Sequence, residues 1–350
     1  LPYRGSEEPI DTWLDPLLRR YADLRRKLAE KGTSQGVYKW ISKDVHKRFR
    51  FDERYYLHPT DQGFTEMGRS GLGRCEDITN MITFAARSVG LATAADFTPA
   101  WGHRDNNHAW NVLLGPDGRG FDKGNAHAAK VYRKKFSLQR DALPYRLPEG
   151  RDAPNRFLAS KTIVDVTDQY APTTDVTVEL DAAARGDERF AYLCVFNAGR
   201  WVAIHWGEVG EDGKVTFDRM GRNVLYLPAV HDGKALKPAA PPLIVHQGGQ
   251  IEVLTGSGPA TSVVVTAVKP RQRSVDTLVE TPVSYLKEST RYQLKCWDGG
   301  DWKDVEDFVA TKEAPSFESL PEDGLYWLVP EESRRLERPW RIHEGRQRFR

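Results

Sequence analysis

The sequence predicts an α+β amino-terminal part, followed by two repeated all-β sandwich modules. Apolar residues recur at helical spacing within the first 90 residues, and strand-like segments follow them. From about residue 161, short β-branched and aromatic runs alternate with Gly-, Asp- and Pro-containing turns. A helix followed by consecutive strands is typical of an α+β core, and 350 residues suffice for two or three cores.

Two helices are predicted in the amino-terminal part. The first covers Asp11–Gly32, with a leucine-rich face, Asp11 as its N-cap and Gly32 as its stop. The second covers Cys75–Ser88 and is closed by Gly90. The side chains expected to be buried on it are Ile78, Met81, Ile82, Ala85, Ala86 and Val89.

Two strands follow the second helix. The segments ATAADFTPAW (92–101) and HAWNVLLG (108–115) have strand composition, and the GPDGRG turn leads on into Phe121 and Asp122. Because strands joined by a short turn pair with each other, the second strand and residues 121–122 are expected to lie side by side.

The carboxy-terminal half contains an internal repeat. Three aromatic landmarks recur at an offset of 100 to 101 residues: Trp201 with Trp302, Phe217 with Phe317 and Tyr226 with Tyr326. This predicts two β-sandwich modules of about 90–100 residues, a usual size for one sandwich domain. The turns NAGRW and DGGDW are each expected to end in a tryptophan packed in a core.

The predicted domain organisation has four parts. Residues 1–34 form an amphipathic helix that packs on the core, and residues 35–160 form the core itself. Residues 161–256 and 257–350 form the first and second sandwich modules.

Composition and charge describe an ordinary globular chain. The hydrophobic fraction is 39% and the charged fraction is 29%. Lys and Arg (51) nearly balance Asp and Glu (49), so the formal charge of +2 gives no global field for nucleic acid or an anionic membrane. We expect the basic runs at residues 130–136 and 341–350 to be solvated faces or strand edges, and we expect no nucleic-acid partner.

Three further features limit the class of protein. No apolar run approaches the roughly 18 residues that span a bilayer, so no transmembrane segment is expected. The chain opens at LPYRGSEEPI without an initiator Met or an apolar leader, which favours a mature form that has lost a secretion signal. Cys75, Cys194 and Cys296 form neither a disulfide framework nor a CxxC zinc pattern. Cys194 and Cys296 are expected to be core thiols in separate modules.

Cys75 has a setting that favours reactivity. It follows the glycine-rich segment GRSGLGR and opens the second predicted helix. A thiol at a helix N-terminus feels the positive end of the helix dipole and unpaired backbone N–H groups, and both favour the thiolate. The same N–H groups can hold the oxyanion of a tetrahedral intermediate, as acyl transfer requires.

A reactive thiolate needs a general acid–base partner, and a third group must fix the tautomer of that partner's imidazole. His108 begins the second strand within NNHAWNVL, and Asp122 is the candidate third group on the paired segment. His127 or Asp96 could supply the third contact instead.

This order of residues resembles the transglutaminase-like superfamily, which has a papain-related fold. The residues that carry the resemblance are Gly73-Arg74-Cys75-Glu76-Asp77, the segment AARSVGLATAADFTP, His108-Ala109-Trp110 and Phe121-Asp122. It covers roughly residues 35–160. It implies a papain/transglutaminase-like core with Cys75 as nucleophile, His108 as general base and acid, and Asp122 as orienting carboxylate.

The segments DFTPAWGHRDNNHAWNVL and KVYRKKF look closer still to a bacterial branch, in which β-sandwich domains follow the core and the proteins are often exported. The resemblance implies a thiol enzyme that cleaves or exchanges an amide or isopeptide bond through a Cys75 thioester, with hydrolysis favoured over crosslinking. The substrate would be a peptide, a protein or a glycan-linked amide. No cofactor is implied, and the compartment would be the periplasm or the cell surface.

The alternative is a non-catalytic cell-surface binding or scaffolding protein that retains this core. Two departures keep it open: LATAADF replaces the family's Pro-Ala-Arg signature, and FDKGNAH lacks the usual Asp-Pro-Thr. The sequence leaves the substrate and the oligomeric state undetermined.

Other side chains near the motif are candidate ligands. Trp101, His103 and Trp110 are candidate substrate contacts, with His103 at the rim of the cleft and either tryptophan packing or walling an acyl-binding tunnel. A Zn²⁺ site could be assembled from His103, His108, Asp122 and His127. The five-residue interval between His103 and His108 suits neither a helix face nor strand alternation, so no metal is expected.

Overall fold

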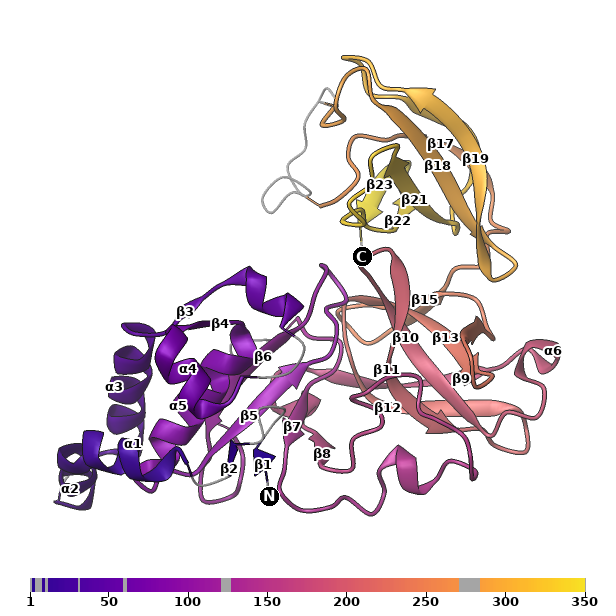
Figure 1. The fold of residues 1–350 in the computed structure, drawn as a ribbon. Coiled ribbons are helices and arrows are strands. Elements are labelled where there is room, and N and C mark those ends of the chain that lie inside the picture. The colour runs from indigo at the N-terminus through magenta and orange to yellow at the C-terminus, as the bar shows by residue number, and fades with distance from the viewer. Residues whose placement is uncertain are drawn as a thin grey trace.

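The structure is a computed structural model, and it describes residues 2–3, 8–9, 12–30, 32–58, 62–120, 127–270 and 284–349. The larger helices gather in the amino-terminal part, and strands fill most of the rest (Figure 1). The helices are α1 (Leu14–Arg20), α2 (Ala22–Glu30), α3 (Ser34–His46), α4 (Phe64–Ser70), α5 (Cys75–Ser88) and α6 (Ala182–Arg185), with 3-10 helices η2 (Glu53–Leu57), η3 (Leu143–Tyr145) and η4 (Thr167–Gln169). None of the described helices is both long and apolar enough to cross a bilayer.

Helix α5 lies at the centre of the α+β part. Its bounds match the prediction, and Gly90 follows it with a φ of 89°. All the side chains predicted to be buried are buried except Ile78, which is half-buried. Asp77, Thr79, Asn80, Thr83 and Ser88 are buried as well. The helix is therefore covered on nearly all sides, because α1, α3 and the neighbouring strands pack around it.

The helix predicted over residues 11–32 is divided in two. Tyr21, between α1 and α2, has φ −108° and ψ 18°, which are not helical values. The Tyr21 ring is 3% exposed and its hydroxyl donates to Asp44 Oδ2 on α3 at 2.8 Å, so the break accommodates a buried contact. Gly32 follows α2 as predicted, since a Cβ there would lie 2.9 Å from the Lys27 carbonyl oxygen. Asp11 lies outside the described residues.

The core sheet has four antiparallel strands in the order β6-β5-β7-β8. Strands β5 (Thr93–Thr98) and β6 (His108–Leu113) are the two predicted ones, and Thr98 pairs with His108. The turn after β6 is closed by a bridge between Leu114 and Gly120. Residues 121–126, including Asp122, lie outside the described residues.

The prediction that the basic runs are solvated was wrong for three of their cations. Lys130, just before β7 (Tyr132–Lys134), is 0% exposed, and Arg133 is 2% exposed. Arg341, in the carboxy-terminal run, is 5% exposed. Each cation pairs with a carboxylate from a segment distant in sequence. Lys130 lies 2.6 Å from Asp165, at the end of β8 (Ile163–Asp165). Arg133 lies 2.8 Å from Asp96, and Arg341 lies 2.6 Å from Glu252. Pairing makes burial of these charges tolerable.

The remainder of the chain is mostly β. In the first β region (β9–β16), β10 (Phe190–Asn197) pairs with β11 (Arg200–Glu208) and β13 (Val224–His231). In the second (β17–β23), β18 (Arg291–Asp298) pairs with β19 (Asp301–Val309) and β21 (Leu325–Pro330). The other strands are β1 (Pro2–Tyr3), β2 (Glu8–Pro9), β3 (Arg50–Phe51), β4 (Leu72–Gly73), β9 (Thr173–Glu179), β12 (Lys214–Gly221), β14 (Leu236–Pro238), β15 (Leu243–Val245), β16 (Ile251–Val253), β17 (Ala260–Val264), β20 (Ser316–Pro321), β22 (Trp340–His343) and β23 (Arg346–Phe349).

The hairpin tryptophans do not lie in separate module cores, as the sequence had suggested. Trp201 and Trp302 are half-buried, and both rings contact Trp297, at centroid distances of 5.6 Å and 5.2 Å. Trp302 also contacts Phe196, from the first β region, at 5.9 Å. Each tryptophan is thus covered partly by the other β region, which strand alternation alone cannot reveal. Cys194 is fully buried and Cys296 half-buried, against different apolar clusters.

Candidate functional site

The glycine-rich segment fixes the start of α5 and therefore the place of Cys75. Gly71 ends α4 with a left-handed φ of 60°. Gly73 is packed so closely that a Cβ would lie 2.7 Å from side-chain atoms of Phe49 and Asp77. Asp77 in turn accepts a 2.9 Å hydrogen bond from the backbone N–H of Arg74 and caps the helix. The glycine and the aspartate of the Gly-x-Cys-x-Asp motif therefore have structural roles.

The Cys75 sulfur lies where the start of α5 meets the start of β6. The backbone N–H groups of Glu76 and Ala109 donate to it. Because Ala109 directly follows His108 in β6, the helix start and the strand start bring the predicted nucleophile and the predicted base into one neighbourhood.

The electrostatics of this pair differ from the sequence-based expectation of a depressed thiol pKa. Burial raises the pKa of Cys75 above its ordinary value, although the two backbone N–H groups and Arg74 oppose this. Burial, helped by the charge of Arg104, lowers the pKa of His108. The Cys75 thiol and the His108 imidazole are therefore both neutral near pH 7, and a neutral imidazole can accept a proton.

His108 contacts two tryptophans. Its ring is stacked against Trp101 at a centroid distance of 6.2 Å and against Trp110 at 5.6 Å. These indoles are 3% and 7% exposed and belong to one apolar cluster. In this structure they orient the imidazole, and contact with a substrate stays a prediction.

The two alternatives for the third contact are engaged elsewhere. Asp96 is fully buried, binds Arg133 through both carboxylate oxygens and accepts a 2.6 Å hydrogen bond from Tyr170. His127 packs against His103, with ring centroids 5.8 Å apart. No residue in the described part of the chain hydrogen-bonds the His108 ring. Asp122 lies outside that part, so its role as the orienting carboxylate stays a prediction.

His103 lies at an exposed position. Partial burial against Trp101 and His127, together with the charges of Arg104 and Arg338, lowers the pKa of His103 to about 4. The side chain is therefore neutral near pH 7 and can donate or accept a hydrogen bond. Its contact with substrate stays a prediction.

Tyr56, in η2, is a site residue that the sequence analysis missed. Burial raises the pKa of Tyr56, and so does the charge of the neighbouring Cys75, while the side chain of Asn106 opposes the shift. Its segment has no motif and no clear periodicity. Only the parallel pairing of β3 with β4 brings η2 to the segment that precedes Cys75, so a long-range contact would have been needed to find it.

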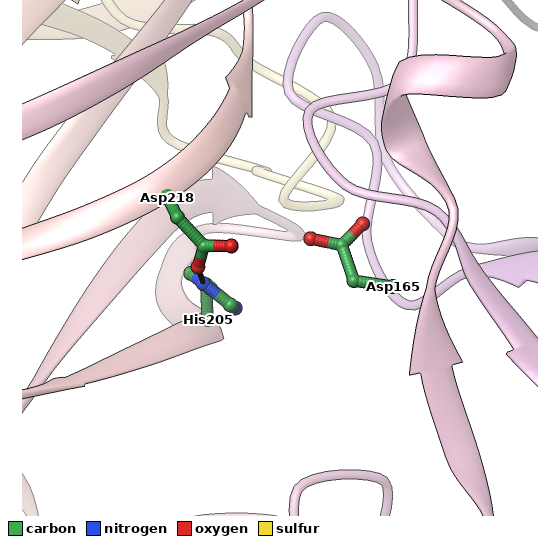
Figure 2. A group of neighbouring side chains, drawn as sticks. All are labelled: Asp165, His205 and Asp218. Carbon is green, nitrogen blue, oxygen red and sulfur yellow. Dashed lines mark hydrogen bonds and ion pairs between the residues drawn. The ribbon is translucent and has the colours of Figure 1, made fainter.

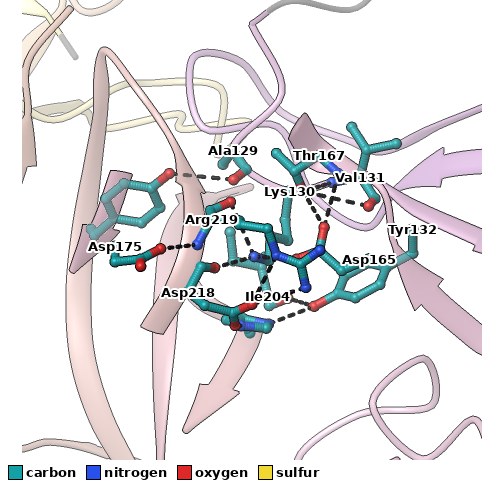
Figure 3. Close-up of polar contacts among 12 residues, drawn as sticks. Ala129, Lys130, Val131, Tyr132, Asp165, Thr167, Asp175, Ile204, Asp218 and Arg219 are labelled. Atoms are coloured by element: carbon teal, nitrogen blue, oxygen red, sulfur yellow. Dashed lines mark hydrogen bonds and ion pairs between the residues drawn. The ribbon is translucent and has the colours of Figure 1, made fainter. Parts of the chain in front are cut away.

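A second titratable cluster joins the core sheet to the first β region. Asp165 ends β8, His205 lies on β11 and Asp218 on β12, and their potential ligand atoms lie within 4.8 Å of one another (Figure 2). The Lys130 ammonium is 2.6 Å from Asp165 and also contacts the backbone carbonyls of Asp218 and Arg219 (Figure 3). Asp165 is therefore already paired with the Lys130 ammonium, and His205 lies 2.7 Å from Asp218, so the cluster is a partly buried ion-pair network.

The zinc alternative involves different residues: His103, His108, Asp122 and His127. Since Asp122 lies outside the described residues, that set cannot be assembled from the structure.

A cavity of about 570 Å³ opens beside the ion-pair network. Its charged lining residues are Arg140, Arg146 and Arg219, together with Asp141, Asp165 and Asp218. Cations and carboxylates are balanced there, so the wall does not select a ligand by charge.

Part of the sequence matches a known protein family. Residues 23–121 match the family model described as the transglutaminase-like superfamily, and this range includes both Cys75 and His108. No curated protein matches the sequence. The chain therefore contains a transglutaminase-like domain, followed by a mostly β carboxy-terminal region.

Proposed function

We propose that the protein is a thiol enzyme that cleaves amide or isopeptide bonds through a thioester on Cys75. The position of the Cys75 sulfur carries the proposal. It lies at the first residue of a helix, receives the N–H groups of Glu76 and Ala109, and meets the strand end that carries His108. These groups match the needs of acyl transfer: a nucleophile, a base and oriented backbone donors.

The proposed reaction has two steps. His108 accepts the thiol proton as the sulfur attacks the carbonyl carbon, and nearby N–H groups stabilise the oxyanion. His108 then donates that proton to the amine, the C–N bond breaks and a thioester remains. In the second step His108 takes a proton from water, which attacks the thioester and releases a carboxylic acid and the free thiol. Asp122 is proposed to orient His108 during both steps.

A peptide, protein or glycan-linked amide is the proposed substrate class, and hydrolysis is preferred to crosslinking on the resemblance to bacterial members. We also propose that residues 161–256 and 257–350 are repeated sandwich modules. The matched strand pairing supports this, and so do the register shifts after Leu193 and after Leu294, which stand at equivalent places in the two hairpins. Export of the protein remains a proposal that rests on the resemblance alone.

The direct test is trapping of the acyl-enzyme. Wild type, Cys75→Ser and Cys194→Ser proteins are incubated with a panel of peptide amides, quenched in acid and weighed as intact proteins. We expect an acyl adduct on wild type and on Cys194→Ser but none on Cys75→Ser, with a carboxylic acid product even when an added amine competes with water. If no amide in the panel acylates wild type or releases product, the non-catalytic binding role becomes the better account.

A further inference from the structure

The loop that leads into His108 is a compact structure of its own. Residues 99–107 join the paired ends of β5 and β6. The backbone N–H of Trp101 donates to the Asn106 carbonyl at 3.1 Å and closes the loop, while Asn106 has a left-handed φ of 73°. A loop closed in this way turns several of its carbonyl groups toward its own centre, where they need donors.

Asn197, at the end of β10, supplies those donors. Its side-chain nitrogen lies 3.1 Å from the carbonyl oxygen of Trp101, 3.1 Å from that of Arg104 and 3.0 Å from that of Asn106. Its side-chain oxygen accepts the Asn106 N–H at 3.1 Å. Asn197 is 6% exposed, so water cannot easily replace these bonds.

Arg338, just before β22 in the second β region, holds the same loop from another side. It is 2% exposed, and its guanidinium donates to the carbonyls of Gly102 and Phe196 and contacts Asp105 at 3.3 Å. Asp105 also accepts the backbone N–H of Ala198 at 2.7 Å. The loop is therefore bound by both β regions, through buried groups whose hydrogen bonds are costly to leave unmade.

We propose that Asn197 and Arg338 are positioning residues for His108 and Cys75, which makes both β regions part of the catalytic unit. This inference rests on the proposed function. The two residues act through the loop: its last residues run directly into His108, and its Trp101 stacks on the His108 ring. Its Asn106 also lies near Tyr56, whose pKa is raised by the charge of Cys75. Displacement of a catalytic group by about 1 Å can lower the reaction rate about a hundredfold. A loop that is held from both sides therefore keeps His108 in place.

The test uses the full chain and iodoacetamide. The second-order rate constant for alkylation of Cys75 is measured from pH 5 to 9 in wild type, Asn197→Ala and Arg338→Met. We expect the rate constant near pH 7 to fall about tenfold or more in both variants. We also expect the acid limb of the profile to move up toward pH 6.5, because a released loop exposes the His108 ring to water. If Asn197 and Arg338 had a purely structural role, the acid limb of the profile would stay at the wild-type pH.

Matched controls exist for both variants. Asp298 ends β18 at the hairpin position that corresponds to Asn197 but is exposed, and Arg341 is buried against Glu252 instead of the loop. We expect Asp298→Ala and Arg341→Met to keep the wild-type profile. If Arg338→Met does not fold, Arg338→Lys takes its place and Asn197→Ser is measured beside it. We then expect smaller changes in the rate constant and in the acid limb, in the same direction.

Two results would overturn the inference, and they can be told apart. If Cys75 is reactive in wild type while folded Asn197 and Arg338 variants keep its rate and profile, the positioning role is wrong but the proposed function stands. If Cys75 in wild type reacts no faster than Cys296, the proposed function fails and the positioning role fails with it.

Discussion

Burial and hydrogen bonding act in opposite directions on the Cys75 thiol. Burial raises its pKa, whereas the N–H groups of Ala109 and Glu76 favour the thiolate. Tyr56 adds a hydroxyl group that can donate to the thiolate as well. The proton therefore has to be accepted by His108 as the reaction proceeds, so the geometry around the sulfur matters more than a preformed ion pair.

Replacement of Tyr56 by Phe tests this balance at a single atom. Loss of the hydroxyl donor should raise the Cys75 pKa further and slow alkylation near pH 7 by about tenfold, equivalent to ~1.4 kcal/mol. Tyr55→Phe is the matched control, because Tyr55 packs against His58. Equal alkylation rates in the two variants would show that the Tyr56 hydroxyl has no influence on the thiol.

Gly73 tests the packing that places the same sulfur. Ala at this position would bring its Cβ to 2.7 Å from atoms of Phe49 and Asp77. We expect Gly73→Ala to lower the free energy of unfolding by about 1–3 kcal/mol and to slow Cys75 alkylation. Gly68 lies inside α4, and no atom lies within 4 Å of a Cβ added there. Gly68→Ala should therefore raise the free energy of unfolding by up to about 1 kcal/mol. Urea unfolding of both variants measures the difference, and a stable Gly73→Ala would mean that the segment can shift at little cost.

Whole elements are joined by the buried charges that follow β6. Lys130 connects the segment before β7 to the end of β8 and to β12 through Asp165 and two carbonyl groups (Figure 3). Arg133 binds Asp96 within the core sheet, and Tyr170 links Asp96 to Trp110 beside His108. The core sheet is thereby tied both to the first β region and to the wall of the candidate site.

Loss of the Lys130 charge should be costly. Lys130→Met removes the closer of the two cations at the carboxylate of Asp165, which is 7% exposed, and leaves Arg219 at 3.4 Å. It also leaves the carbonyls of Asp218 and Arg219 without this donor, so we expect the free energy of unfolding, measured with urea at pH 7, to fall by about 2–3 kcal/mol. In the exposed control, Lys237→Met removes a 2.8 Å pair with Asp232 and should leave the free energy of unfolding almost unchanged, because solvent screens this pair. Similar losses in the two variants would contradict a buried network.

Much of the amino-terminal architecture is predictable because its signals are local. Helix α5 and the pairing of β5 with β6 follow from periodicity, a short turn and a glycine stop within one stretch of chain. Long-range contacts carry what the sequence does not show. The burial of Lys130, the role of Tyr56 and the tryptophan contacts between the β regions each depend on a partner from a distant segment.

At the scale of the whole molecule, histidines with lowered pKa values predict acid sensitivity. Burial lowers the pKa of His205 and of His108, and that of His103 falls from an ordinary value of 6.5 to about 4. Between the lowered pKa of a histidine in the native protein and its ordinary value of 6.5, the unfolded chain binds more protons than the native protein. The contribution of these histidines to the free energy of unfolding is therefore complete above about pH 6.5 and is lost as the pH falls toward 4. We expect His205→Gln to flatten the fall in urea midpoint between pH 7 and pH 5. A parallel fall in wild type and variant would assign the loss to other groups.

Whether Cys75 and His108 act together can be measured from the pH dependence of alkylation in wild type and His108→Ala. Cys296 is the internal reference, because burial raises its pKa as it does that of Cys75. We expect Cys75 to react faster than Cys296 near pH 7, and we expect His108→Ala to remove both this advantage and the acid limb below pH 6.5. Equal rates for the two thiols in wild type, or a Cys75 profile unchanged by the loss of His108, would contradict this expectation.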